Sequence, residues 1–482
     1  MRDSALQVAV QQLNWESPML LQLHTWKSML YSRPVSGVNE SVSMGITRDS
    51  DVRRLLVITY HFPPDGAIGG QRWAGLSKYL ARLGWEVHVI TASAASSQQA
   101  TPGVHRHVRP RRRTLDDLYK AAARRFRQTS NGDRPNAPEN PSRLRASSLL
   151  RPIAALRGIL GSSLSLPDQG RGWVAQAAGA ARALLRERKF DVVITSGPPH
   201  SSHFAGLLST LGRDAEFWID MRDPWSAMHQ THLPEDRVIR AERFLLRRLE
   251  RLVFPRAARV IVNTREFESA LKADEPELDV VWFPNGIDLE ELPVRDLSAV
   301  EKCSLSYVGT LYANRNLSSV LAAMRALLRD RPDAALLRLN VAGPLDSPNR
   351  ERMKDDIVAA GLAPQVRIHG VLPRAQALEL LSRSHLALVL AQDQPMCVPA
   401  KLYESVGLGV PTLVIAEETS AAAREARRVG AMTLDGGDVD GLRSLMQDML
   451  AGRLPTRIES QASISYEDLA FEMDHLLKRL AH

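Results

Sequence analysis

The fold of this chain is decided by the stretch RRLLVITYHFPPDGAIGGQRWAGLSKYLARLGWEVHVITA at residues 53–92. The apolar run within 53–64 ends at two prolines, which predicts a buried parallel strand followed by a loop. A glycine-rich loop and a helix over about 71–83 come next, and EVHVITA (86–92) predicts a second strand. Strand, crossover helix and strand make a βαβ unit, which indicates an α/β fold with a parallel sheet.

The same alternation of strands and helices occupies most of the remaining chain. It resumes at about residue 171 and supplies further strands up to FPNG (283–286). The chain then turns polar over about 288–300, and CSLSYVGT (303–310) begins a second series. We therefore predict two doubly wound, Rossmann-like domains that face each other across a cleft, which is the default binding site.

These changes of pattern give the domain boundaries. Residues 1–50 show little periodicity and form an N-terminal extension to which we assign no function. The first domain spans 51–294 and contains an irregular basic insertion at about 95–170. The second domain spans 295–455, and an amphipathic helix within 456–482 is expected to pack back on the first domain.

Composition excludes several classes of protein. The 482 residues are 44% hydrophobic and 24% charged, which is neither disordered nor membrane-spanning composition. The two cysteines, Cys303 and Cys397, provide no disulfide framework and no metal-ligand spacing, so we expect a cytoplasmic protein. Peripheral attachment to the inner face of the plasma membrane is compatible with this composition.

The net charge of +8 is concentrated in one window. Residues 101–170 hold 14 Lys and Arg against 5 Asp and Glu. Such a window suits an anionic membrane surface, an anionic small molecule or nucleic acid, and the alternative is a solvated loop. Aromatic residues are sparse here, which argues against a stacking platform for bases, so we expect no nucleic-acid partner.

Dinucleotide-binding oxidoreductases have the same alternation of strands and helices, so the sequence must be checked for their motifs. The loop GAIGG (66–70) does not fit G-x-G-x-x-G, and the second strand ends in TAS (91–93), where a ribose-binding carboxylate is expected. What remains is Gly69-Gly70 before a helix N-terminus. That arrangement either receives an anion or simply makes a tight turn.

Six motifs of the chain belong together. They are YHFPPDGAIGGQRWAGLSKYLARLGWEVHVITA, SGPPHSSHFAGLL, IDMRDPW, FPNGID, YVGTLYANRN and VPAKLYESVGLGVP. Their order resembles that in retaining glycosyltransferases of the GT-B fold, and they are most similar to family 4, among its bacterial surface-polysaccharide members. The resemblance covers residues 53–455 and implies that the first domain binds the acceptor and the second a nucleotide-sugar donor.

The resemblance assigns residues to the donor's diphosphate. Gly69 and Gly70, with Arg72 beside them, would face it from the first domain. The family's G-R-L-x-x-x-K-G segment begins here at Gly309, and Arg315 occupies the lysine position. Thr310 replaces the family's arginine. One cation is thus missing, and Lys401 is the expected substitute.

The family's donor motif is a pair of glutamates eight positions apart. Glu404 matches the second, which would hydrogen-bond the ribose. Met396 stands where the first is expected, so backbone groups at 396–398 would have to replace that carboxylate.

Further site residues follow two strands of the first domain. The family often carries a His-Asp pair where this chain has Arg222 and Asp223. Asp220 or Asp223 would accept the proton of the acceptor hydroxyl or position that hydroxyl, and the alternative is that Asp223 caps the loop and pairs with Arg222. His200 is a candidate catalytic residue, and His203 and Arg222 are candidate substrate contacts, with a structural role as the alternative for both histidines.

These assignments predict a hexosyltransferase that uses a nucleotide sugar and a glycan or polyprenyl-diphosphate-linked acceptor. We expect no cofactor and no metal, because the D-x-D segment at 438–440 lies in a polar turn. The basic window would hold the first domain against an anionic inner leaflet. Two alternatives stay open: a GT-B-fold sugar-nucleotide epimerase, and a non-catalytic GT-B protein in a glycan assembly complex.

Overall fold

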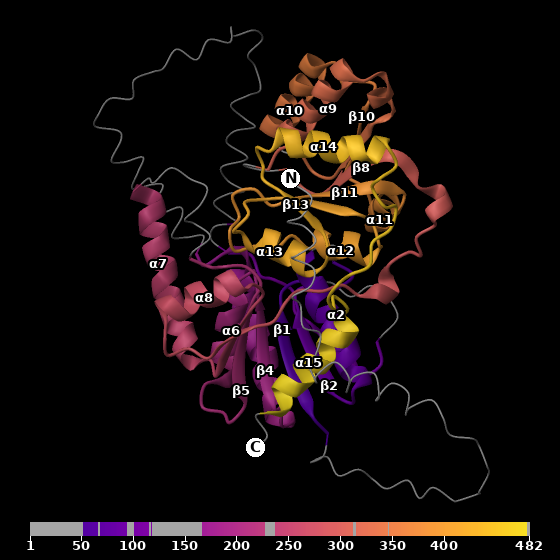
Figure 1. The fold of residues 1–482 in the computed structure, drawn as a ribbon. Helices are drawn as coiled ribbons and strands as arrows, with labels where there is room; N and C mark the ends of the chain where they lie inside the picture. The colour runs from indigo at the N-terminus through magenta and orange to yellow at the C-terminus, as the bar shows by residue number, and fades with distance from the viewer. Residues whose placement is uncertain are drawn as a thin grey trace, which may run out of the picture. The chain divides into compact units, whose positions relative to one another are not determined.

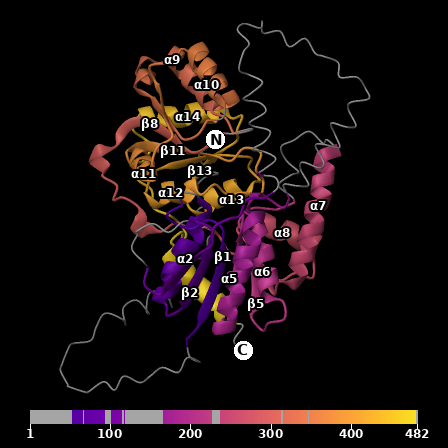
Figure 2. The ribbon, with the colours of Figure 1, turned by 180° about the vertical axis from the view of Figure 1, so that it is seen from behind.

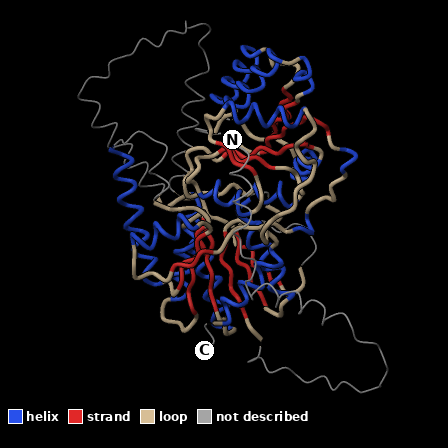
Figure 3. Tube along the Cα trace, in the orientation of Figure 1, coloured by secondary structure: helices blue, strands red, loops and turns tan. Residues whose placement is uncertain are grey.

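Two parallel sheets carry the fold (Figure 1, Figure 3). The computed structural model describes residues 52–65, 68–93, 101–114, 117, 166–226, 237–311, 315–345 and 347–479, without the side chains of 237–242 and 347–350. The predicted extension 1–50 and most of the basic insertion lie outside these ranges. Within them, no helix combines the length and apolar composition needed to cross a membrane.

Among the described residues, the first sheet has seven parallel strands in the order β3-β2-β1-β4-β5-β6-β7. The order reverses between β1 and β4, which makes that point the topological switch of a doubly wound sheet. The strands are β1 (Arg54–Thr59), β2 (Glu86–Thr91), β3 (Val104–Val108), β4 (Val192–Gly197), β5 (Glu216–Met221), β6 (Arg259–Val262) and β7 (Val280–Trp282).

Successive side chains along a strand point to opposite faces of the first sheet, so the apolar core of this half lies in two layers, one on each face. Leu55 and Val57 pack in the cluster formed with α2 (Gln71–Arg82), while Leu56 and Ile58 pack in the cluster formed with α5 (Val174–Glu187). Figure 2 shows α5 on the face that is turned away in Figure 1. The remaining helices of this half are α6 (Ser201–Thr210), α7 (Arg237–Val253) and α8 (Arg265–Asp274).

The second sheet has six parallel strands in the order β10-β9-β8-β11-β12-β13. The predicted fold class, α/β with two doubly wound parallel sheets, is therefore confirmed. The strands are β8 (Glu301–Val308), β9 (Arg338–Ala342), β10 (Val366–Gly370), β11 (Ser384–Leu390), β12 (Thr412–Ile415) and β13 (Met432–Leu434). The helices are α9 (Ser318–Asp330), α10 (Ser347–Ala360), α11 (Arg374–Ser382), α12 (Lys401–Gly407), α13 (Ala421–Arg428), α14 (Val439–Leu450) and α15 (Tyr466–Lys478).

One strand differs from the sequence-based expectation. Residues 104–108 were expected to belong to an irregular basic stretch, but they form β3, which pairs in parallel with β2. Its histidines and arginine give no apolar signal, because β3 is an edge strand and only one of its sides is paired.

The last helix, α15, lies on the first half of the chain. It packs against α2, and Leu469 and Met473 belong to the same apolar cluster as Leu76. Where the chain crosses back, Ile287 N–H donates to Ile464 O at 2.8 Å, and Tyr466 N–H donates to Ile287 O at 3.0 Å.

Gly75 leaves room for α15 and provides a test of this packing. A Cβ atom there would lie 2.2 Å from Tyr466 Cδ2, so Gly75→Ala must displace the ring. We expect the free energy of unfolding to fall by about 1–3 kcal/mol, measured by urea denaturation. The control is Gly179→Ala, on the exposed face of α5 with no heavy atom within 4 Å, which should stabilise by roughly 0.5–1 kcal/mol. Equal stability of Gly75→Ala and the parent would contradict the packing.

Candidate functional site

A cavity of about 1080 Å³ is lined by the loops that follow the strands of both sheets. Ligands of doubly wound proteins collect at the carboxyl ends of the parallel strands, and here both sheets direct those ends to one space. From the first half the lining includes His61, Pro198, Asp223, Asn263 and Asn285; from the second it includes Thr310, Gly343, Leu372, Gln394 and Glu404.

The N-terminus of α2 reaches this cavity through Gly69 and Gln71. Its N-cap residue, Gly70, makes no side-chain cap, so the first amides of the helix lack a side-chain acceptor. A Cβ atom on Gly69 would lie 2.3 Å from Arg222 Nη1, and one on Gly70 would lie 2.9 Å from Phe62 Cα. Gly70 is therefore needed for close packing against the backbone of Phe62. The positive end of the α2 dipole lies at the cavity, where it suits an anion.

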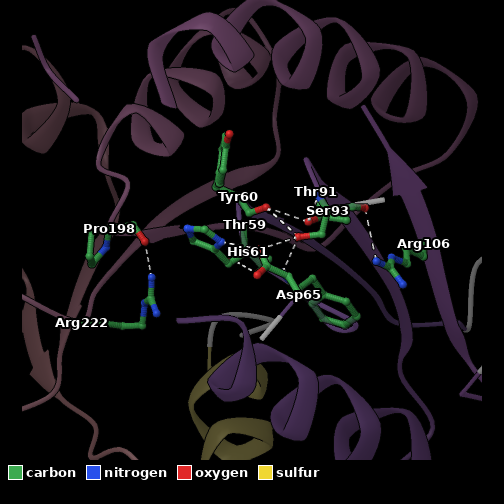
Figure 4. A network of polar contacts seen from close by, with 10 residues as sticks. Thr59, Tyr60, His61, Asp65, Thr91, Ser93, Arg106, Pro198 and Arg222 are labelled. Atoms are coloured by element: carbon green, nitrogen blue, oxygen red, sulfur yellow. Dashed lines mark hydrogen bonds and ion pairs between the residues drawn. The ribbon is translucent and has the colours of Figure 1, made fainter. Parts of the chain in front are cut away.

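Arg222 and Asp223 extend from the end of β5 along the cavity wall. Figure 4 shows the guanidinium group of Arg222 directed at Pro198, whose carbonyl oxygen accepts from Nη2. Burial raises the pKa of Asp223, and the guanidinium groups of Arg222 and Arg315 oppose that shift. Asp223 is thus a carboxylate of increased basicity on the wall of the cavity.

Asp220 has a different position from Asp223. Its side chain is fully buried, does not line the cavity, and accepts hydrogen bonds from Trp73 Nε1 and Ser196 Oγ, both at 2.8 Å. Its other oxygen lies 3.2 Å from Arg72 Nη2. Of the two aspartates predicted to handle the acceptor proton, Asp223 alone lines the cavity.

Arg72 joins this buried group to the loop after β7. It is 2% exposed and donates to Pro284 O at 2.6 Å and to Asn285 Oδ1 at 2.9 Å. Arg72 does line the cavity, but these contacts already occupy much of its donor capacity. Arg72 therefore holds the walls of the site together, and its place in the cavity lining is compatible with contact to a ligand.

The two predicted histidines lie outside the cavity lining. His200 stacks on Trp225 with ring centroids 5.0 Å apart, and His203 Nδ1 is 2.9 Å from Thr195 Oγ1. Burial lowers the pKa of His200 well below its usual value and that of His203 to about 3. These positions fit the structural alternative, and the neighbouring Pro198 and Pro199 line the cavity in their place.

In the second half, Glu404 is held by two cations. Its oxygens lie 2.5 Å from Lys401 Nζ and 2.5 Å from Arg374 Nη1, and its side chain is buried. All three residues line the cavity. Lys401 and Glu404 were predicted to face one ligand together, and the structure adds Arg374 from the first turn of α11.

The loops after β8 and β9 pack closely beside these residues. A Cβ atom on Gly343 would lie 2.0 Å from Gly309 O, and Gly343 has a φ of +133°, so no other residue fits there. Gly309, Thr310 and Arg315 all line the cavity. Arg315 Nη2 donates to Gln394 Oε1 at 2.6 Å.

Met396 connects the two halves of the chain. Its carbonyl accepts from Thr264 Oγ1 at 2.9 Å, and its side chain packs against an apolar cluster of the first half. Met396, Cys397 and Val398 all line the cavity. That backbone groups at 396–398 replace the missing carboxylate stays a prediction.

Two features of the site were not found in the sequence. Arg374 gave no signal beyond being the first charged residue after a strand. His61 lines the cavity directly after β1, and its Nδ1 lies 2.6 Å from Asp65 Oδ2, which also accepts from Ser93 Oγ at 3.2 Å. In Figure 4 the His61 ring points toward Pro198 and Arg222.

Two family models match the sequence. Residues 69–286 match the glycosyl transferase 4-like domain, and residues 290–463 match glycosyl transferases group 1. With the two doubly wound sheets, these matches identify the chain as a glycosyltransferase of the GT-B fold. The predictions of a GT-B fold and of an enzyme are thereby confirmed. No curated protein matches the sequence.

Solved structures share the same architecture. Sucrose-phosphate synthase from Thermosynechococcus elongatus has a TM-score of 0.60 at 14% identity, over 89% of this chain and 99% of that one. HepE from Anabaena, in complex with UDP and glucose, has a TM-score of 0.55 at 13% identity, over 89% and 100%. The α,α-trehalose 6-phosphate synthase from Burkholderia multivorans has 0.55 at 14%, over 89% and 99%. At these identities the likeness shows the fold alone.

The buried His203 predicts a pH-dependent stability. Its pKa is about 3 in the folded protein against an ordinary 6.5, so the folded state holds fewer protons than the unfolded state between these values. The contribution of His203 to the free energy of unfolding is therefore fully present above pH 6.5. Below that pH the free energy of unfolding falls by about 1.4 kcal/mol per pH unit because of this group. Urea denaturation at pH 7.5 and 5.5 should show a smaller loss for His203→Asn than for the parent.

The matched control is His475→Gln, an exposed position on α15. It should lose as much stability as the parent over the same pH range. If His203→Asn lost as much as His475→Gln, the assigned neutral state of His203 would be wrong.

Proposed function

We propose that this enzyme is a retaining hexosyltransferase that moves a sugar from a nucleotide-sugar donor to a glycan or polyprenyl-diphosphate-linked acceptor in bacterial surface-polysaccharide assembly. The observation that carries the proposal is a group of three cations, Arg315, Arg374 and Lys401, on the second-half wall of the cavity. The α2 N-terminus lines the same cavity from the first half. A diphosphate held there would meet these cations and the positive end of the α2 dipole together.

These groups suit the chemistry of sugar transfer. The bond between the anomeric carbon and the diphosphate breaks, and the leaving group gains negative charge in the transition state. Fixed cations in a partly enclosed cavity stabilise that charge without reorganisation. We therefore propose that transfer requires no metal. The assignment of retention comes from the family-4 resemblance of the motifs.

The first-half wall supplies a group for the acceptor. Asp223 would accept a hydrogen bond from the acceptor hydroxyl and place its oxygen beside the anomeric carbon. Because burial raises the pKa of Asp223, its carboxylate holds a proton more strongly than an exposed aspartate does. HepE has been solved with UDP and with UDP-glucose, so UDP-sugars are the first donors to test.

The donor assignment is tested with Lys401→Ala and Arg374→Ala. Each removes one cation from the cavity, and we expect kcat/KM for the nucleotide sugar to fall about 10–100-fold, since a charge-assisted contact is typically worth about 1.5–3 kcal/mol. Calorimetry with the nucleoside diphosphate should show weaker binding. The control is Arg383→Ala, a largely exposed arginine at the C-terminal end of α11 that pairs with Glu379.

Asp223→Asn separates donor binding from transfer. This variant should bind the nucleoside diphosphate as tightly as the parent but lose transfer to acceptor by about 100-fold or more. Product formed from the donor alone would indicate an epimerase instead. Full transfer activity in all three cavity variants would remove the basis of the proposal.

We also propose that the enzyme works at the inner face of the plasma membrane, where a polyprenyl-diphosphate acceptor resides. Helix α7 supports this within the described residues. Phe244 and Leu252 are 57% and 61% exposed, and the Arg248 guanidinium lies 5.1 Å from the Phe244 ring centroid. Exposed apolar and basic side chains on one helix are typical of elements that lie in a membrane interface.

Vesicle sedimentation tests this location. The full chain should sediment with anionic vesicles and much less with neutral ones, and added salt should weaken the binding. The double variant Phe244→Ser, Leu252→Ser should reduce the bound fraction several-fold. The control is Leu336→Ser, which is 60% exposed in the second half. Binding that ignores lipid charge would contradict the proposal.

A further inference from the structure

Two neighbouring strands carry metal-ligand residue types on one face. Glu86 and His88 are the first and third residues of β2, and His105 and His107 are two apart in β3. Residues two apart in a strand share a face, and the parallel register pairs His88 with His105. The four side chains therefore form a cluster near the amino ends of these strands, whereas the cavity lies at the carboxyl ends.

The ligand atoms converge. His88 Nε2 lies 2.9 Å and His105 Nε2 lies 3.8 Å from the same oxygen, Glu86 Oε1. One ligand atom from each of the three residues lies within 4.8 Å of the other two. Imidazole nitrogen and carboxylate oxygen bind a dication at about 2.0–2.2 Å. The ligand atoms of one ion must therefore lie as close to one another as these three do. The side chain of His105 is 52% exposed, so its ring can adjust and leaves a path from solvent.

His107 provides the outer contact that metal-binding histidines commonly have. Its Nε2 lies 3.0 Å from His88 Nδ1, and the two rings stack at 9°. When His88 donates its Nδ1–H to His107, the lone pair of His88 is fixed on Nε2, which faces Glu86 and His105. A hydrogen bond of this kind sets the tautomer and orientation of a ligating imidazole.

We propose that Glu86, His88 and His105 bind a transition-metal dication of the Zn²⁺ class, with His107 as the hydrogen-bond partner of His88. Two imidazoles and one carboxylate suit Zn²⁺, Co²⁺ or Ni²⁺ and do not suit Mg²⁺, which prefers oxygen ligands. The site lies apart from the donor cavity and does not depend on the proposed function. Its bound ion connects β2 to the edge strand β3.

The Arg188 guanidinium group competes with the metal ion for the carboxylate of Glu86. Its Nη1 lies 2.6 Å from Glu86 Oε1, the oxygen that faces both histidines, while Arg54 Nε holds the other oxygen at 2.7 Å. Arg54 is buried in β1, but the Arg188 side chain is 45% exposed just after α5. Metal binding therefore displaces Arg188 and leaves Arg54 in place. Removal of the Arg188 charge should tighten the site.

The experiment uses the full chain without a histidine tag at pH 7.5. Calorimetry with ZnCl₂ should show a site that is lost or weakened about 10-fold or more in His105→Ala, and tightened several-fold in Arg188→Gln. Zinc should also raise the melting temperature of the parent but not of His105→Ala, because a ligand of the folded state stabilises it. MgCl₂ should give neither signal.

The control is His475→Ala, an exposed histidine far along the chain, which should bind zinc as the parent does. His105 is exposed, so its replacement leaves the core intact. Unchanged zinc affinity in His105→Ala would overturn the proposal, and so would weaker binding in Arg188→Gln. Loss of the zinc signal in His475→Ala would show that zinc binds at another site, and this result would also overturn the proposal.

Discussion

The buried ion pair between Arg72 and Asp220 is the contact on which the first-half wall of the cavity depends. Asp220 lies in β5, and its carboxylate also accepts hydrogen bonds from Trp73 in α2 and Ser196 in β4. One carboxylate therefore connects α2, β4 and β5. Arg72 carries the connection on to the loop after β7. Removing one partner of such a pair leaves a buried charge uncompensated, which typically costs about 3–5 kcal/mol. The uncapped turn of α2 and the Arg222–Asp223 segment both take their positions from it.

The second-half wall of the cavity has a different electrostatic arrangement. Glu404 already has two cationic partners, so the group of Arg374, Lys401 and Glu404 carries one net positive charge before any ligand enters. Carboxylate oxygens keep further lone pairs, so Glu404 can still accept from a ribose hydroxyl. Arg374 comes from a different loop of the second half and lines the same cavity as Thr310, the position where the family resemblance implies an arginine.

The sequence was sufficient for the parts of the molecule that follow from local pattern. Buried parallel strands are continuous apolar runs, so β1, β4, β8 and β11 and the doubly wound order were predictable. Residues just after these strands were expected near one another for the same geometric reason. The environment of each side chain was not predictable, because it depends on residues far along the chain. Asp220 is buried by Trp73, and Arg374 meets Glu404 through the packing of α11 beside α12.

The return of the chain through Ile287 and Ser465 has a mechanical consequence. The two halves are joined by two covalent connections, one before β8 and one before α15. These connections are hydrogen-bonded to each other at Ile287 and again where Arg295 Nη1 donates to Thr456 O at 2.6 Å. The hydrogen bond from Thr264 Oγ1 to Met396 O and the ion pair of Arg424 with Glu266 also join the halves. Tyr466, which directly follows this crossing, also lines the cavity. A change in the relative position of the two halves at this crossing would therefore move part of the cavity wall.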